Sequence, residues 1–84
     1  MDAALFLDMD MSILGVKEED YHIYADQIRR EYAHIAEPDY RKGRTRVLRG
    51  FLQHQYIYIS PTFRTLFESQ ARSNIVQEIA RLEG

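Results

Sequence analysis

The sequence contains no cysteine, no long apolar run and no excess of basic residues. Without cysteine the chain can form neither a disulfide framework nor a thiolate metal site, and this composition suits a reducing, cytoplasmic location. The N-terminal apolar stretch carries acids and is far shorter than the roughly 20 residues that span a bilayer, so we expect neither a signal peptide nor a membrane anchor. The formal net charge of -2 argues against a dedicated nucleic-acid binder.

Local catalytic signatures are also missing. The sequence has no GxSxG, no Walker loop, no GxGxxG and no nucleophilic cysteine. Its three histidines, His22, His34 and His54, are scattered and form no HxxxH, HxH or HD pair, which favours surface histidines over a histidine-based metal site. With 84 residues, 45% of them hydrophobic, and no repeat or linker, residues 1–84 are expected to form a single domain.

Hydrophobic periodicity predicts a small all-α bundle of about four helices joined by short loops. The segments run from about Asp2 to Ser12, from Glu18 to about Ala36, from the Glu37-Pro38-Asp39 break onward, and from Ser60-Pro61 to the C-terminal end. Gly15 is expected to stop the first helix in a left-handed conformation. Ser60 followed by proline reads as a helix N-cap.

The third and fourth helices have a predicted inner face. Gly43 and Gly50 weaken the third helix by roughly 1 kcal/mol each and leave room for close packing. The aromatic and β-branched run within 53–60 is interpreted as a buried connection, because a lone strand has no partner. The inner residues are expected to be Tyr40, Val47, Leu48, Phe51 and Leu52, then Phe63, Leu66, Phe67, Gln70, Asn74, Ile75, Ile79 and Leu82.

Two acids, Asp8 and Asp10, interrupt the apolar stretch LFLDMDMSILG at residues 5–15. An ionised carboxylate buried there without a partner would cost several kcal/mol, so each acid needs water, a donor, a cation or a metal. On a helix the two side chains point about 200° apart, so only one of them can bind a given ion. The alternative is that one acid caps a helix or pairs with a base while the other is solvated.

A basic run, RKGRTRVLR, occupies residues 41–49. Guanidinium groups match phosphate oxygens bidentately, which makes Arg44 and Arg46 candidate phosphate ligands. The stronger interpretation is an ordinary solvated helix face. The many tyrosines and phenylalanines fall mostly at core spacing, which favours packing over base stacking.

The chain contains, in this order, the segments LDMDMSILG, Tyr21 with Tyr24, IRREY, Tyr40 with GRTRVL, FL, IYISPTF and ESQARSNI. Together these segments resemble the C-terminal part of a bacterial group of predicted metal-dependent phosphohydrolases of the HD-domain superfamily. The resemblance extends from Phe6 to about Glu78.

The resemblance implies an all-helical fold and a divalent metal held by a His, a His-Asp doublet and a later Asp, with a metal-bound water attacking a phosphoester. Asp10 is the first choice for that later Asp and Asp8 the second. The other ligands would lie upstream of Met1, so this chain alone is expected neither to hold the metal nor to hydrolyse phosphoesters.

Apolar surface meant for a missing half would be left exposed, which favours a homo-oligomer or a partner chain that covers the N-terminal helix. The alternative function is a non-catalytic helical interaction or oligomerisation module that uses the face of Met1 to Leu14.

Overall fold

Helices dominate the structure, a computed structural model that describes residues 11–84. The described part contains no strand, and the predicted all-α bundle is confirmed. None of its helices is both long and apolar enough to cross a membrane. The elements are a 3-10 turn η1 (Ser12–Gly15), α2 (Glu18–Glu31), α3 (Glu37–Gln53), α4 (Pro61–Phe63), a π-helical turn η2 (Arg64–Glu68) and α5 (Ser69–Glu83). The first predicted helix, about residues 2–12, lies almost wholly outside the described residues.

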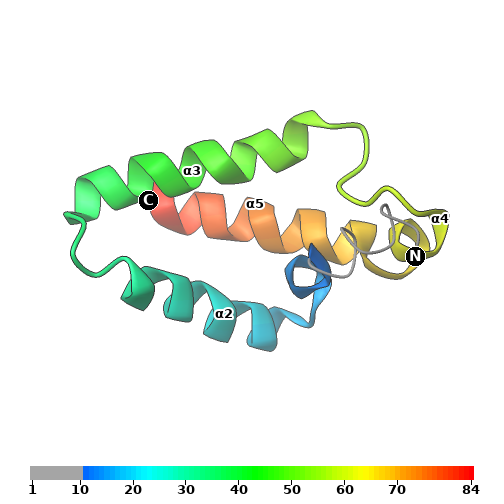
Figure 1. Ribbon diagram of the computed structural model, residues 1–84, viewed down its shortest axis with the longest axis horizontal. Coiled ribbons are helices and arrows are strands. Elements are labelled where there is room, and N and C mark those ends of the chain that lie inside the picture. Colours follow the sequence, from blue (N-terminus) through cyan, green and yellow to red (C-terminus); the bar gives the residue numbers. More distant parts are fainter. Residues whose placement is uncertain (1–10) are drawn as a thin grey trace.

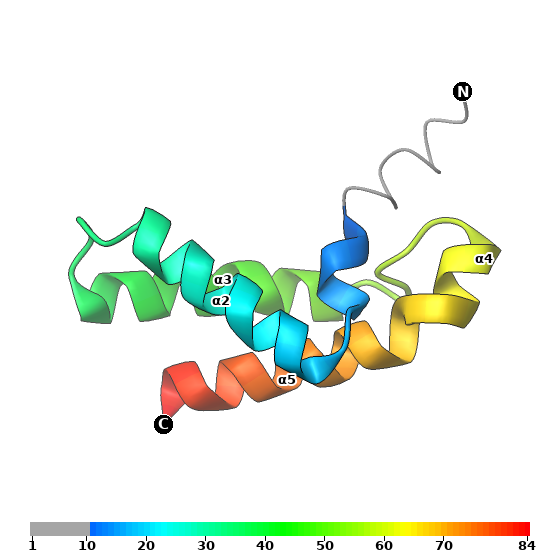
Figure 2. The ribbon, with the colours of Figure 1, turned by 90° about the horizontal axis from the view of Figure 1, so that it is seen from below.

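The helix α5 is the centre of the arrangement. Figure 1 shows α2 and α3 on either side of α5, and Figure 2 shows both of them on the same side of it. The two helices therefore rest on α5 as a pair, and η1 packs against the start of α2 and against α5.

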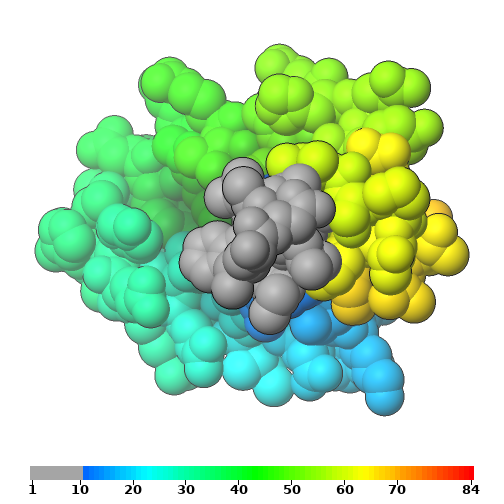
Figure 3. Space-filling model, turned by 45° about the vertical axis from the view of Figure 1, so that its right-hand side comes forward, coloured from blue at the N-terminus to red at the C-terminus, as the bar shows by residue number. Residues whose placement is uncertain are grey.

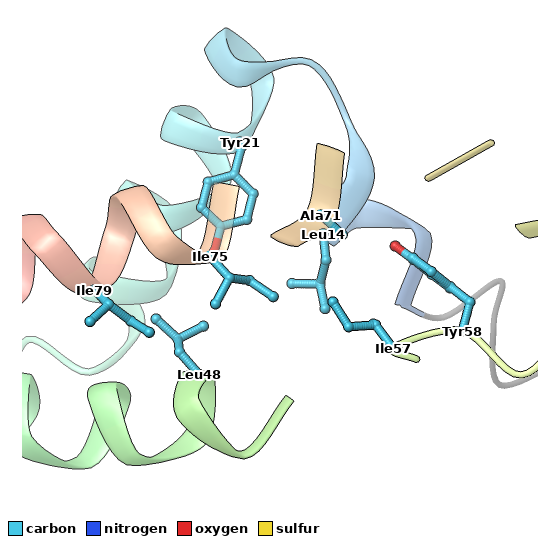
Figure 4. Close-up of a cluster of buried hydrophobic side chains, with 8 residues drawn as sticks. All are labelled: Leu14, Tyr21, Leu48, Ile57, Tyr58, Ala71, Ile75 and Ile79. Carbon is cyan, nitrogen blue, oxygen red and sulfur yellow. The ribbon is translucent and has the colours of Figure 1, made fainter. Parts of the chain in front are cut away.

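The core is built from side chains that are far apart in the sequence (Figure 4). Each large apolar side chain that is fully buried contributes roughly 1.5–3 kcal/mol. Leu48 and Ile75 are fully buried where α3 packs on α5, and Tyr21 brings α2 to the same cluster. The buried cluster consists of Leu14, Tyr21, Leu48, Ile57, Tyr58, Ala71, Ile75 and Ile79.

The second helix ends at Glu31, five residues before the predicted end at Ala36. Residues 32–35 form a turn instead, and Ala36 has an extended backbone before Pro38 in the first turn of α3. Arg29 stabilises this turn, because its guanidinium donates to the carbonyl oxygens of Tyr32 and Ile35 at 2.9 and 3.2 Å. A side chain from the last turn thus supplies partners for backbone groups that leave the helix.

The predicted inner face of α3 is confirmed for Tyr40 and Leu48, while Phe51 and Leu52 are partly buried against the core. It is wrong for Val47, which is 53% exposed. Successive residues of a helix differ by about 100°, so Val47 turns towards the gap between α2 and α3 when Leu48 enters the core.

In the last helix Leu66 was also expected inside but is 63% exposed. It lies in the π-helical turn η2, which shifts the angular register of the residues around it. Leu66 also precedes the buried Ile75 by nine residues, and at about 100° per residue the two side chains point to opposite sides of the helix.

The connection between α3 and α4 is buried, as expected for Ile57 and Tyr58. Both residues donate their backbone N–H groups to the Glu68 carboxylate at 2.9–3.1 Å, and Arg72 donates to two carbonyl groups of the same connection. Ser60 caps the next helix by accepting from the N–H of Phe63 at 3.2 Å, which confirms the predicted N-cap. Figure 3 shows this connection and α4 along one side of the molecule.

The glycines have roles that differ from those predicted. None of the described glycines has a positive φ, so Gly15 is not in a left-handed conformation. It is buried against the last helix, where an added Cβ would lie 2.6 Å from Cβ of Phe67. Gly43 and Gly50 have no neighbouring atom within 4 Å of an added Cβ, so the expected close packing at these two positions is wrong.

The difference between Gly15 and Gly50 can be tested by measuring the stability of alanine variants. We expect Gly15→Ala to lower the free energy of unfolding by about 1–3 kcal/mol, because the new methyl overpacks the contact with Phe67. Gly50→Ala is the matched control and should raise it by about 0.4–1 kcal/mol, since alanine fits the open helical position. Urea denaturation followed by circular dichroism measures both. Equal effects from the two substitutions would contradict the close approach at Gly15.

Candidate functional site

A buried polar cluster joins the three long helices. The Arg44 guanidinium on α3 donates through Nε and Nη2 to the two carboxylate oxygens of Glu78 on α5, at 2.8 and 3.1 Å. Tyr21 on α2 donates its hydroxyl to Oε1 of the same carboxylate at 2.5 Å. The Tyr24 ring, also on α2, lies under the guanidinium, 5.6 Å from ring centroid to Cζ.

The cluster is nearly inaccessible to water. The side chains of Arg44 and Glu78 are 10% and 5% exposed. Burial first, and then the hydrogen bond to Glu78, raise the pKa of the Tyr21 hydroxyl, which therefore stays protonated as a donor. Burial alone would lower the pKa of Arg44, but the hydrogen bond to Glu78 and its charge outweigh burial and raise it. Arg44 and Tyr21 together complete the hydrogen bonding of the buried carboxylate.

This arrangement holds α2 and α3 on α5 through one carboxylate. A bidentate guanidinium–carboxylate pair fixes direction as well as distance, so it sets how the helices lie relative to one another. Charges buried in this way contribute little net stability compared with apolar side chains, but losing one partner is costly. The chemistry of the cluster is therefore structural.

An apolar groove lies beside the cluster. It has a volume of about 420 Å³ and is formed by α2, the turn after it and α3, with no lining residue from α5. Tyr32 and Val47 on its walls are 46% and 53% exposed. We name it the α2/α3 groove; its lining residues are Ile28, Tyr32, Ile35, Asp39, Tyr40, Gly43, Arg44 and Val47.

A smaller polar cavity of about 200 Å³ lies where α2, the start of α3 and the end of α5 meet. Glu37 bridges Arg29 and Arg41 there, at 2.9 Å from each, and the hydrogen bonds from Arg41 and then Arg29 lower the pKa of the Glu37 carboxyl. Arg29 also stacks on the Tyr40 ring, with 4.4 Å from Cζ to the centroid. These guanidinium groups already have partners that hold the turn and the helix start.

The two candidate phosphate ligands are in different environments. The guanidinium of Arg44 is engaged with Glu78, which leaves it little capacity for an external phosphate. Arg46 is exposed and lines an open basic surface with Lys42 and Arg49, where Arg49 pairs with Glu83. Asp8 and Asp10, the candidate metal ligands, lie outside the described residues.

Within residues 11–84 no three His, Cys, Asp or Glu side chains lie close enough together to hold a metal ion. His22 lies 3.7 Å from Glu18 on α2, and the His34 ring lies 6.3 Å from the Tyr32 ring. The backbone carbonyl of His54 accepts from Arg72. The described histidines thus belong to three separate places in the fold.

The sequence reasoning missed Glu78, the residue on which the cluster depends. A signal for it existed, because Gln70 and Asn74 were placed on the inner face of the last helix and Glu78 follows at the same four-residue spacing. Asn74 is itself buried, and its amide donates to the carbonyl oxygens of Leu14 and Val16 at 3.0 and 2.8 Å. The inner face of α5 thus carries polar side chains that bind the other elements.

Comparison with known proteins yields no match to a family model, to a curated protein or to a solved structure.

Proposed function

We propose that this chain is the C-terminal helical portion of an HD-type phosphohydrolase and does not hydrolyse phosphoesters by itself. The observation that carries the proposal is the ordered set of segments that resemble this family. Asp10 or Asp8 would supply one ligand to the divalent metal. A cytoplasmic location belongs to the same proposal.

The contacts made by the resembling segments support the proposal that this chain is a helical portion of such a protein. Tyr21, Tyr24 and Arg44, from two of these segments, meet in the polar cluster. Glu68 and Asn74, from ESQARSNI, hold the buried connection and the η1 turn. The segments thus contain residues that join the helices to one another, as expected for a helical subdomain that supports a catalytic site built elsewhere.

The test is turnover of a chromogenic phosphate monoester by the purified chain with Mn²⁺, Mg²⁺ or Co²⁺. We expect no hydrolysis above the metal-only background, because one carboxylate cannot hold the metal and leave an open position for water. Metal-dependent turnover that is lost in Asp10→Ala but kept in the surface control Asp26→Ala would overturn the proposal.

A second candidate function is a non-catalytic helical interaction module. The α2/α3 groove favours it, since apolar walls that are about half exposed are typical of binding surfaces. The originally expected surface, Met1 to Leu14, is less suitable at its end because Leu14 is buried in the core. Residues 1–10 of that surface lie outside the described part of the chain.

A further inference from the structure

The α2/α3 groove lies between two helices of opposite net charge, and the charged residues that line the groove itself are Asp39 and Arg44 of α3. The helix α2 carries five acids against two arginines, whereas α3 carries four arginines and one lysine against two acids. Asp20 and Glu31 lie four residues before and seven after Tyr24, on the side of α2 that faces Arg44 of α3. The acidic helix therefore carries exposed carboxylates beside the groove, outside its lining.

Two exposed basic residues of α3, Lys42 and Arg46, lie beside the groove and line the open basic surface next to it. Arg46 is exposed and directly precedes Val47, a groove residue. Among the described residues, no side chain pairs with Asp20, Glu31, Lys42 or Arg46. A partner that covers the apolar floor and walls would thus meet one rim of each sign.

We propose that the groove is covered by the same groove of a second copy of this chain, in a dimer whose two-fold axis runs along the groove. Rotation about such an axis places the acidic α2 of each copy over the basic α3 of the other. An axis across the groove would instead place α2 on α2 and α3 on α3, with like charges opposed. The charge pattern therefore selects both the partner and its orientation.

The proposed dimer interface has an apolar centre and a charged rim, as specific interfaces usually do. Apolar side chains such as Val47 and Tyr32 would be removed from water at the centre, and the free charges would lie at the rim. The groove residues nearest the axis would meet their own counterparts, as an isologous contact requires. Four helices, α2 and α3 from each copy, would then form a layer between the two α5 helices.

This inference rests on the second candidate function, the interaction module, and is independent of phosphoester hydrolysis. Sedimentation equilibrium of the full chain from micromolar to millimolar concentration tests it. We expect a monomer–dimer equilibrium whose Kd rises at least about tenfold in Val47→Glu, because a carboxylate would be buried in the apolar centre. Val76→Glu is the matched control, since Val76 is also 53% exposed but lies on α5, and its Kd should be unchanged.

Charge exchange tests the orientation. Asp20→Lys and Arg46→Glu should each weaken self-association, because each places like charges across both symmetry-related contacts. An equimolar mixture of the two variants should recover a heterodimer with a Kd near that of the wild-type dimer. Circular dichroism establishes that each exposed-site variant remains folded.

A wild-type chain that stays monomeric throughout, equal effects of Val47→Glu and Val76→Glu, or a mixture that does not recover association would each overturn the two-fold pairing. A monomer that instead binds a different protein through the groove would also overturn self-pairing, while leaving the interaction module standing. Turnover in the phosphatase assay would affect only the hydrolase proposal, so the failures are distinguishable.

Discussion

Glu78→Gln is expected to lower the free energy of unfolding by about 3–5 kcal/mol, a large part of the total stability of so small a domain. The substitution preserves the size of the side chain but removes its charge. Arg44, which is 10% exposed, would then be a buried cation without its counter-charge. Tyr21 would lose a charged acceptor for its hydroxyl, whose 2.5 Å hydrogen bond ends on this carboxylate. Urea denaturation at a protein concentration that keeps the chain monomeric measures the effect.

Glu83→Gln provides the matched control. Glu83 also pairs with an arginine of α3, Arg49, but both side chains are about half exposed, and such pairs contribute at most about 1 kcal/mol. The double variant Arg44→Met with Glu78→Leu removes both buried charges and should recover most of the stability lost in Glu78→Gln. A loss in Glu78→Gln no larger than that in Glu83→Gln would contradict the role assigned to the cluster.

The helical architecture could be predicted because local signals agree with it. Apolar spacing identified α2, α3 and the last helix, and Ser60 before proline identified a cap that the structure confirms. The buried connection followed from the absence of a partner strand, and Ile57 and Tyr58 are indeed buried. These features depend on residues close in the sequence, so periodicity and turn chemistry suffice to find them.

The failures have a common cause in tertiary contacts. Val47 and Leu48 are both apolar neighbours, and only the position of α5 decides that Leu48 is buried while Val47 faces the groove. Gly15 is small because Phe67, more than fifty residues later, approaches it. Arg44 looked like a phosphate ligand because its partner, Glu78, lies 34 residues away. Patterns of residues that are close in the sequence do not reveal contacts between residues so far apart in it.

The packing of α3 on α5 gives the second large expected effect. Ile75 is fully buried at the centre of the core, and Ile75→Ala should lower the free energy of unfolding by about 2–5 kcal/mol through lost burial and the cavity left behind. Ile75→Val, which deletes a single methylene group, should cost about 0.5–1.5 kcal/mol and stays measurable if the alanine variant does not fold.

The neighbouring Val76 separates packing from helix propensity. Val76 is 53% exposed on the same helix, and Val76→Ala should change stability by no more than about 0.5 kcal/mol, with a gain favoured because alanine is the better helix former. Thermal and urea denaturation of the three variants at one protein concentration would rank them Ile75→Ala, Ile75→Val and Val76→Ala in decreasing loss. If Val76→Ala were as damaging as Ile75→Ala, the face that α5 buries would have to be reassigned. Glu78 shares the buried face of α5 with Ile75 and Ile79. The buried position of the Arg44–Glu78 pair would therefore have to be reassigned as well.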